Sequence, residues 1–451
     1  MSDKQTNGFE RVIGLDSHPD SFTAAILRGP TPIAAVVEKI CNKVPLGQLQ
    51  NWARKQTSEK DLFVLEASGN SFTVVRTLAA VGRQAKVLES CHLGKLKEAH
   101  ANNDKISAVR IGKAYLAGTA KEVWVPDVKT QERRDLFHAH RKATKRLTQM
   151  QARLRSYLSD NGVRLGKNTR LTQSEDVEEI IRKSYPWSQR QWQLIEGLLL
   201  ELRHADQQRR HWRSLIAQEV LADPQLLSLV RLCGVREMVA FGLGAFIGDI
   251  KRFDHPKKLV KYVGLNPVFD DSGDTEWSGG VGGHGNKYLR CLLVEGAQAI
   301  LRCARTPLAQ WGKRLLARKG VINLVVAAMA RKLTVAAWYL LMGRWTPLDE
   351  IDAHLCVKVG KVMGQVTPEA LKQRGLTLKL LRQQTYQSLR IGMPKADDQA
   401  TSQTNLPNQP PELPKTTLYF LEEEQLTKKE KAARRAQAQR LWDLMHEFRF
   451  R

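Results

Sequence analysis

Two long stretches with a coiled-coil period constrain the fold more than any other feature of the chain. The first carries apolar side chains near every 3.5 residues, at Leu136, Ala139, Ala143, Leu147, Met150, Leu154 and Tyr157. The second runs through Leu194, Leu198, Leu202, Ala205, Trp212 and Ile216, after a polar loop at 159–175. The pattern predicts a coiled-coil arm over residues 126–222, either antiparallel within one chain or paired with another copy. Because the seams leave apolar surface for a second copy, we expect a homo-oligomer, a dimer or tetramer.

The segment before the arm alternates between strand and helix patterns. Residues 11–28 hold two β-type runs around a polar turn, and the run at 61–66 leads through a loop into a helical pattern. A further short strand is expected at 86–90. This order predicts an α/β domain over residues 8–125.

The segment after the arm is predicted to be mainly helical over residues 223–345, with glycines at its helix junctions. Gly234 separates two helical patterns there, either as a hairpin that presents backbone N–H groups to a phosphate or as an ordinary helix corner. We further predict a helical extension at 346–392, a disordered linker at 393–416 and a basic tail helix at 417–451. The tail helix has a basic face that either follows a phosphate backbone or is solvated.

Apolar content and cysteine spacing exclude several protein classes. The stretch 321–341 is apolar enough for a membrane span, but Arg331 and Lys332 lie at its centre, so we expect a buried core helix. The start of the chain lacks the apolar core of a secretory signal, which predicts a cytoplasmic protein without a membrane partner. Six cysteines without a C-x-x-C pair favour neither a zinc site nor a disulfide framework.

Charge indicates a polyanionic partner. The chain has 71 Lys and Arg against 46 Asp and Glu, a formal net charge of +25. Solubility alone needs a much smaller imbalance, so the excess favours nucleic-acid binding. Basic residues beside the first seam are expected to contact phosphates, namely Arg133, Arg134, Lys142, Lys145 and Arg146.

Three carboxylates follow or precede apolar elements in a way that suggests metal binding. Asp16 ends one strand pattern, Glu66 ends another, and Asp104 stands where a loop enters a helix. Acids that converge in this manner hold two Mg²⁺ ions about 4 Å apart across a phosphate in phosphoryl-transfer enzymes. Taken singly, each is more often a turn residue or a helix cap.

The order of several short motifs carries a family resemblance. VIGLD at 12–16, EASG at 66–69 and NNDKISA at 102–108 are followed by IGDIKRF at 247–253, YVGLNP at 262–267, GGVGGHGNKYLRCLLVEGA at 279–297 and MARKL at 329–333. Over residues 10–345 the chain resembles the DEDD transposases of the insertion sequence 110 family, whose relatives include the pilin-segment invertases.

The resemblance implies a RuvC-like amino-terminal domain with an RNase H fold, a coiled-coil arm, and a carboxy-terminal transposase domain that supplies a nucleophilic serine. It implies Mg²⁺ at Asp16, Glu66 and Asp104. It also implies a structured guide RNA that pairs with double-stranded DNA, so that base pairing reads the sequence. We add the basic residues within the later motifs as candidate nucleic-acid contacts, namely His284, Lys287, Arg290, Arg331 and Lys332.

Two positions depart from the family pattern. The family's fourth acid follows the third by three residues, where this chain has Ser107. The nucleophilic serine position, counted back from Leu289 and Arg290, falls on Gly282, which has no side chain for a covalent intermediate. Ser278 is the alternative nucleophile if the register is shifted by four residues, and His284 is a nitrogen nucleophile in principle.

Two functions follow from these departures. In the first, the protein is a repurposed transposase that keeps RNA and DNA binding, with strand exchange impaired or lost. In the second, it is an active RNA-guided recombinase that uses a serine in the 278–285 loop. A third interpretation, a generic basic scaffold, leaves the three acids without a purpose.

Overall fold

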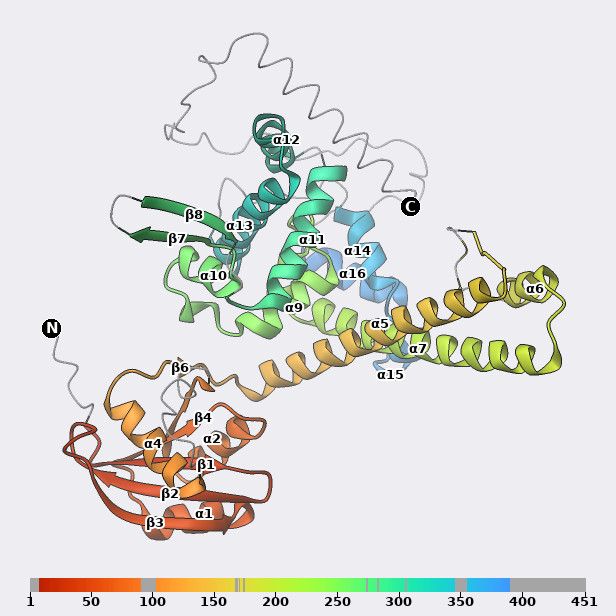
Figure 1. The fold of residues 1–451 in the computed structure, drawn as a ribbon. Coiled ribbons are helices and arrows are strands. Elements are labelled where there is room, and N and C mark those ends of the chain that lie inside the picture. Colours follow the sequence, from red (N-terminus) through yellow and green to blue (C-terminus); the bar gives the residue numbers. More distant parts are fainter. Residues whose placement is uncertain are drawn as a thin grey trace, which may run out of the picture. The chain divides into compact units, whose positions relative to one another are not determined.

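A computed structural model describes residues 8–90, 103–166, 169, 171–172, 175–272, 275–281, 284–304, 306–344 and 355–389. The chain divides into two compact units, Met1–Asp127 and Val128–Arg451, which are considered separately (Figure 1). Gly282, the predicted linker at 393–416 and the predicted tail helix at 417–451 lie outside the described residues.

The first unit is built on a mixed sheet of six strands in the order β3-β2-β1-β4-β5-β6 (Figure 1). β1 is parallel to β4 and β4 to β5, whereas the remaining pairs are antiparallel. The strands are β1 (Arg11–Ser17), β2 (Ser21–Arg28), β3 (Val36–Pro45), β4 (Asp61–Glu66), β5 (Gln84–Leu88) and β6 (Glu122–Val123). The predicted amino-terminal α/β domain is therefore confirmed, and β3 and β6 are strands that were not predicted from the sequence.

Helices cover both faces of this sheet because its central strands are apolar on both sides. Ile13 and Leu15 of β1 pack with residues of α1 (Leu49–Gln56) and α2 (Ser71–Ala79). Val12, on the opposite face, packs with residues of α4 (Asp104–Leu116). Side chains alternate along a strand, so Gly14 and Asp16 share the α4 face with Val12.

A buried ion pair joins the starts of the two parallel central strands. The Arg11 Nη2 atom lies 2.6 Å from Asp61 Oδ2, and the Asp61 side chain is fully buried. Burial alone would raise the pKa of Asp61, but hydrogen bonds from Arg11 and Ser58 outweigh it and hold that pKa below its usual range. Arg11 stands opposite Asp61 in the parallel register, and the same register pairs Leu15 with Leu65. The pair therefore helps to bring the ends of β1 and β4 level with each other.

The second unit begins with a long antiparallel helix pair, α5 (Val128–Asp160) and α7 (Gln189–Ala222), joined through α6 (Glu175–Ser184). Arg133 near the start of α5 bonds to Glu219 near the end of α7, and at the opposite end Gln191 bonds to Asn161 at 2.9 Å. A capping box at Ser188 begins α7. The arrangement agrees with an antiparallel arm within one chain, and supercoiling of the pair stays a prediction.

The predicted seam of α7 was wrong at its start. Leu194 is 58% exposed, whereas Ile195 and Leu199 are buried against α5 and α6. Leu202 and Ala205 are buried as expected. Three consecutive leucines at 198–200 allow several phases of the apolar stripe, so periodicity alone does not select the buried face.

The rest of the second unit is mostly helical around one large apolar core. Its helices are α8 (Pro224–Leu229), α9 (Glu237–Ile247), α10 (Pro256–Val263), α11 (Lys287–Cys303), α12 (Pro307–Lys319), α13 (Ile322–Leu341), α14 (Leu355–Met363), α15 (Pro368–Gln373) and α16 (Leu378–Ser388), with 3₁₀ turns at Ile250–Arg252 here and Leu46–Gln48 in the first unit. A hairpin of β7 (Pro267–Ser272) and β8 (Thr275–Val281) precedes α11.

Gly234 forms a helix corner rather than an open hairpin. Its φ is +75°, and a Cβ atom there would lie 2.6 Å from the carbonyl oxygen of Gly296 on α11. Glycine is therefore required both by the backbone conformation and by the close approach of α11. The contact with α11 favours the helix-corner interpretation.

α13 is long and apolar enough to cross a membrane by length and composition, but half of its most apolar window is buried inside the structure. Val325, Met329 and Leu333 on this helix belong to the core of the second unit. These contacts agree with the predicted core helix.

The approach of α4 to β1 leads to a stability prediction. A Cβ atom on Gly14 would lie 1.9 Å from the carbonyl oxygen of Ala108, a backbone atom that cannot rotate away. We expect Gly14→Ala to reduce the free energy of unfolding, measured by urea denaturation, by about 1–3 kcal/mol or more. Gly47→Ala is the control, since nothing lies within 4 Å of its Cβ position. Equal stability of the two variants would contradict the packing of α4 on β1.

His140 on α5 leads to a pH prediction. Burial, with Arg213 and Arg209 nearby, lowers its pKa from 6.5 to about 4. Between these pH values His140 is protonated in the unfolded chain but neutral in the folded chain. The free energy of unfolding therefore decreases as pH falls from about 6.5 towards 4, by up to about 3 kcal/mol. Denaturant titrations should show a larger loss in the parent protein than in His140→Leu between about pH 6.5 and 5, because carboxylates with lowered pKa values, such as Asp61, add their own loss mainly at lower pH. His204→Ala, on the exposed surface of α7, should keep the pH dependence of the parent.

Candidate metal centre and nucleic-acid interface

Asp16 and Glu66 are brought to one corner of the sheet by the strands that carry them. Asp16 follows Gly14 on the α4 face of β1, and Glu66 follows Leu62 and Val64 on the same face of β4. Since β1 and β4 are parallel neighbours with Leu15 opposite Leu65, both acids stand at the carboxyl ends of adjacent strands. The fold therefore places these two predicted residues on one face and at one edge.

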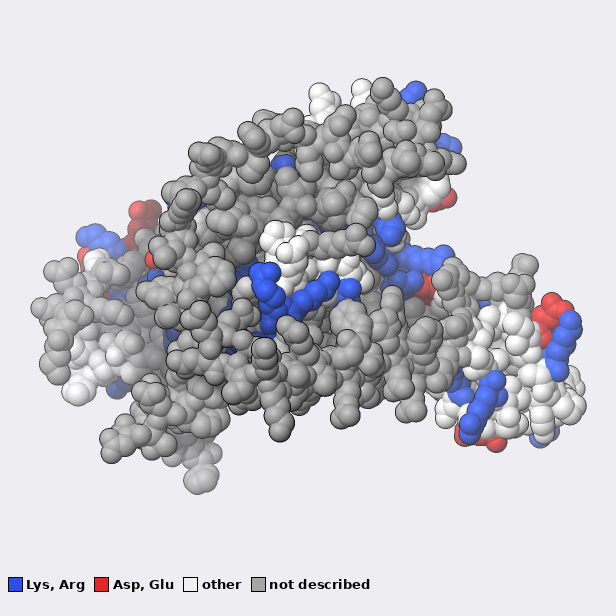
Figure 2. Space-filling view, turned by 90° about the horizontal axis from the view of Figure 1, so that it is seen from above, with Lys and Arg blue, Asp and Glu red and all other residues white. Residues whose placement is uncertain are grey.

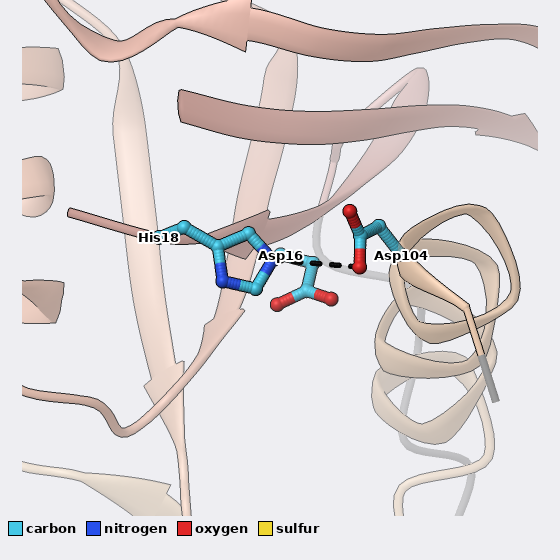
Figure 3. A group of neighbouring side chains, drawn as sticks. All are labelled: Asp16, His18 and Asp104. Atoms are coloured by element: carbon cyan, nitrogen blue, oxygen red, sulfur yellow. Dashed lines mark ion pairs between the residues drawn. The ribbon is translucent and has the colours of Figure 1, made fainter. Parts of the chain in front are cut away.

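Asp104 reaches the same corner from α4. It is the first residue of this helix, which is capped by Asn103 through a 2.9 Å bond from the Ile106 N–H to the Asn103 side chain. The absence of a side chain at Gly14 lets the α4 backbone lie directly on β1. Ligand atoms of Asp16, Asp104 and His18 consequently lie within 4.8 Å of one another (Figure 3). Glu66 is outside this group.

His18 belongs to the cluster but was not predicted from the sequence. Its Nε2 atom lies 3.5 Å from Asp104 Oδ1, and the imidazole points towards the aspartate (Figure 3). The available signal was its spacing, because a residue two positions after Asp16 returns to the same face if the strand continues. The turn after β1 made that continuation uncertain from sequence alone.

Asn70 ties the loops that surround this corner. Its side-chain nitrogen donates to the His18 carbonyl at 2.8 Å, and its Oδ1 accepts from the Ser17 hydroxyl at 3.1 Å. Ser68 also donates to Asn70 Oδ1, at 3.0 Å. The loop after β4 therefore fixes the loop after β1, which carries His18.

Ser107 lies one helical turn after Asp104 on α4 and is half-buried. Residues three apart on a helix share one side, so the side chain at 107 belongs to the same side as Asp104. The helix thus has the geometry in which a carboxylate at 107 would join Asp104, but it presents a hydroxyl.

The loop before α11 is held by backbone contacts. The Arg290 Nη1 atom donates to the carbonyl oxygens of Gly264 and His284, each at 3.2 Å. Asn286 caps α11, and its own N–H donates to the Tyr262 carbonyl at 2.8 Å. Ser278 stands in β8 opposite Phe269. His284 and Lys287 are exposed, as the prediction of nucleic-acid contacts requires.

Comparison with known proteins identifies the family of this region. Residues 228–311, which include α9, α10, the hairpin and α11, match the transposase IS116/IS110/IS902 family. The transposase for insertion sequence element IS1111A of Coxiella burnetii is 24% identical over 281 residues, which cover 62% of this chain and 77% of that protein. These matches support the assignment of the chain to the IS110 family of transposases.

Two further relatives extend the comparison. A probable family 20 transposase of Pseudomonas aeruginosa is 23% identical over 62% of this chain and 83% of its own length. A putative transposase of Sinorhizobium fredii is 24% identical over 60% of this chain and 65% of its own length.

Basic residues on α5 fall into two groups. Arg133 is 12% exposed and bonds to Asp223 at 2.6 Å and to Glu219, and Arg134 donates to the Ala245 carbonyl at 2.9 Å. Their charges are engaged within the chain, which argues against the predicted phosphate contacts at these two positions. Lys142, Lys145 and Arg146 are exposed.

Basic side chains outside the predicted α5 contacts also differ in how far they are exposed to solvent. Arg331 and Lys332 on α13 are half-buried, and the Lys332 ammonium lies 4.6 Å from the centre of the Trp311 ring. Arg141 is exposed and was not among the predicted contacts; its guanidinium lies 4.6 Å from the centre of the Tyr288 ring, next to Lys287 in the sequence. Figure 2 shows Lys and Arg side chains gathered over the middle of the visible face, with fewer Asp and Glu.

Proposed function

We propose that this IS110-family chain is a repurposed transposase that binds DNA and a structured guide RNA, with strand exchange impaired or lost. The observation that carries the proposal is Ser107, which stands one turn after Asp104 in a corner that also holds Asp16, with Glu66 at the end of the neighbouring strand. A complete set of family acids would favour an active enzyme instead.

The order of the strands supports a RuvC-like assignment for the first unit. An antiparallel β1-β2-β3 ribbon is extended by the parallel strands β4 and β5, and the acids stand at the ends of β1 and β4. Asp16, Glu66 and Asp104 supply the carboxylate oxygens that Mg²⁺ prefers, so they would hold the ion. A bound Mg²⁺ would polarise a phosphate oxygen and activate the attacking group.

Replacement of an acid by Ser107 weakens such a site. A neutral hydroxyl contributes no charge to balance a divalent cation and binds Mg²⁺ poorly. A two-ion displacement needs both ions, because each stabilises one of the two in-line oxygens. Loss of one anchoring carboxylate therefore slows the chemical step while leaving nucleic-acid binding intact.

Binding of nucleic acid rests on the exposed part of the charge surplus. The chain carries a net charge of +25, and Lys142, Lys145 and Arg146 project from successive turns of α5. Such rows of cations neutralise phosphates irrespective of base sequence. A guide RNA that reads the DNA by pairing is compatible with a protein that contacts mainly the backbone.

Apolar surface on the helix pair favours a homo-oligomer. Leu194 and Leu200 on α7 are 58% and 63% exposed, and Ile180 on α6 is 49% exposed. Burial of large apolar side chains against a second copy removes them from water and lowers the free energy of the assembly.

The alternative is an active RNA-guided recombinase with a serine nucleophile in the 278–285 loop. Ser278 in β8 favours it, since this strand leads directly into the loop before α11. In that case Mg²⁺ at Asp16, Glu66 and Asp104 supports catalysis without a fourth acid.

Replacement of exposed lysines on α5 tests the binding interface. Each of Lys142→Gln and Lys145→Gln should weaken DNA and RNA binding for all sequences alike and reduce the slope of log affinity against log salt by about one per lost contact. Fluorescence anisotropy over a salt series measures both quantities. Glu132→Gln, an exposed change on the same helix, is the control and should not reduce the slope. A loss confined to one sequence would contradict backbone binding.

Restoration of both family residues tests the degenerate site. Ser107→Asp with Gly282→Ser should raise the rate at which donor DNA is joined to target DNA by about a thousandfold or more, because it returns both the missing carboxylate and the nucleophile. The assay uses the full chain with its copurifying RNA, identified by sequencing, and Mg²⁺. Each single replacement should leave the rate near that of the parent.

The opposite result defines the alternative. If the parent protein already joins donor to target DNA, and Ser278→Ala abolishes the joining, the site is active and the repurposed assignment is wrong.

A further inference from the structure

His18 stands where a metal bound by Asp16 and Asp104 would meet it. The ligand atoms of the three side chains lie within 4.8 Å of one another, and His18 Nε2 lies 3.5 Å from Asp104 Oδ1 (Figure 3). Two neighbouring ligand atoms of an octahedral ion, each about 2.1 Å from it, lie about 3 Å apart. A small movement of side chains therefore suffices for one ion to contact all three.

The position of His18 is set by its backbone rather than by its ring. The His18 N–H donates to the Ser21 carbonyl at 2.8 Å, and the His18 carbonyl accepts from the Asn70 side chain at 2.8 Å. The imidazole is 46% exposed and faces Asp104. The ring is thus available at the mouth of the site, and its removal leaves the turn intact.

The chemistry of this donor set differs from that of a site made only of acids. Mg²⁺ is a hard cation that prefers oxygen and keeps its water, whereas imidazole nitrogen suits first-row transition metals. Ser107 offers no carboxylate on the α4 side. An added nitrogen ligand consequently favours a transition ion over Mg²⁺.

We propose that His18 is a direct ligand of the metal in this chain and that the site prefers a divalent transition ion, represented by Mn²⁺, over Mg²⁺. The proposal rests on the proposed function only in taking Asp16 and Asp104 as metal ligands. It requires neither guide RNA nor strand exchange.

Binding of Mn²⁺ to the full chain tests the preference. Electron paramagnetic resonance gives the Mn²⁺ dissociation constant, and competition of Mg²⁺ with bound Mn²⁺ gives the Mg²⁺ dissociation constant. We expect the parent protein to bind Mn²⁺ more tightly than Mg²⁺. His18→Ala should weaken Mn²⁺ binding about tenfold or more, which corresponds to about 1.4 kcal/mol. The Mg²⁺ dissociation constant should change by less than about twofold in the same variant. His204→Ala, on the exposed surface of α7, is the matched control and should bind as the parent does.

A spectroscopic signature separates a ligand from a mere neighbour. Pulsed electron paramagnetic resonance of bound Mn²⁺ should show hyperfine coupling to ¹⁴N of a coordinated imidazole in the parent and in His204→Ala. The coupling should be absent in His18→Ala. Asp16→Asn should abolish the saturable site altogether, which assigns the signal to this corner of the sheet.

Two different failures are distinguishable. Saturable Mn²⁺ binding that depends on Asp16 but lacks ¹⁴N coupling, or keeps it in His18→Ala, overturns the role of His18 and leaves the carboxylate site of the proposed function standing. Absence of saturable binding of either metal in the parent overturns the metal site itself, and with it the metal ligands assumed in the proposed function.

Discussion

The contact between Gly14 and the backbone of α4 is the constraint on which the candidate metal centre depends. A Cβ atom at position 14 would lie 1.9 Å from the Ala108 carbonyl oxygen and 2.9 Å from the Gly112 nitrogen. Because strand and helix meet at backbone distance, the first turn of α4 reaches the end of β1. Asp104 can then stand beside Asp16, although 87 residues lie between them in the sequence. Neither the strand nor the helix by itself would bring these two residues together.

The distribution of charge separates structural cations from those available to a partner. Glu237 is almost fully buried and pairs with Arg213 at 2.5 Å. Burial would raise the pKa of Glu237, but the bond from Arg213 outweighs it and the pKa is lowered. Arg133 is engaged in the same manner by Asp223. Such buried pairs hold α5, α7 and α9 in place, whereas Lys142 and Lys145 stay in solvent and remain the better candidates for phosphate contacts.

The sequence predicted those parts of the fold and site in which one local rule decides the outcome. Asp16 and Glu66 could be placed because each ends an apolar strand, and alternation fixes the face. Asp104 was selected through its motif, since no local pattern reveals that α4 lies on β1. His18 was missed because its turn is fixed by Asn70, 52 residues away. The shift from Leu194 to Ile195 has a similar cause, because the partner helices choose among neighbouring apolar residues.

Ser107 also affects the electrostatic repulsion among the acids at this corner. Carboxylates crowded at one point repel one another, and the repulsion grows with each additional charge. A hydroxyl on the second turn of α4 removes one charge, and His18 offers Asp104 a polar partner at 3.5 Å. The corner is thereby less dependent on a cation for its stability than a set of four acids would be. The phosphate contacts proposed on α5 belong to the second unit and use none of these acids. A change at Ser107 that slows the chemical step would therefore leave those contacts in place.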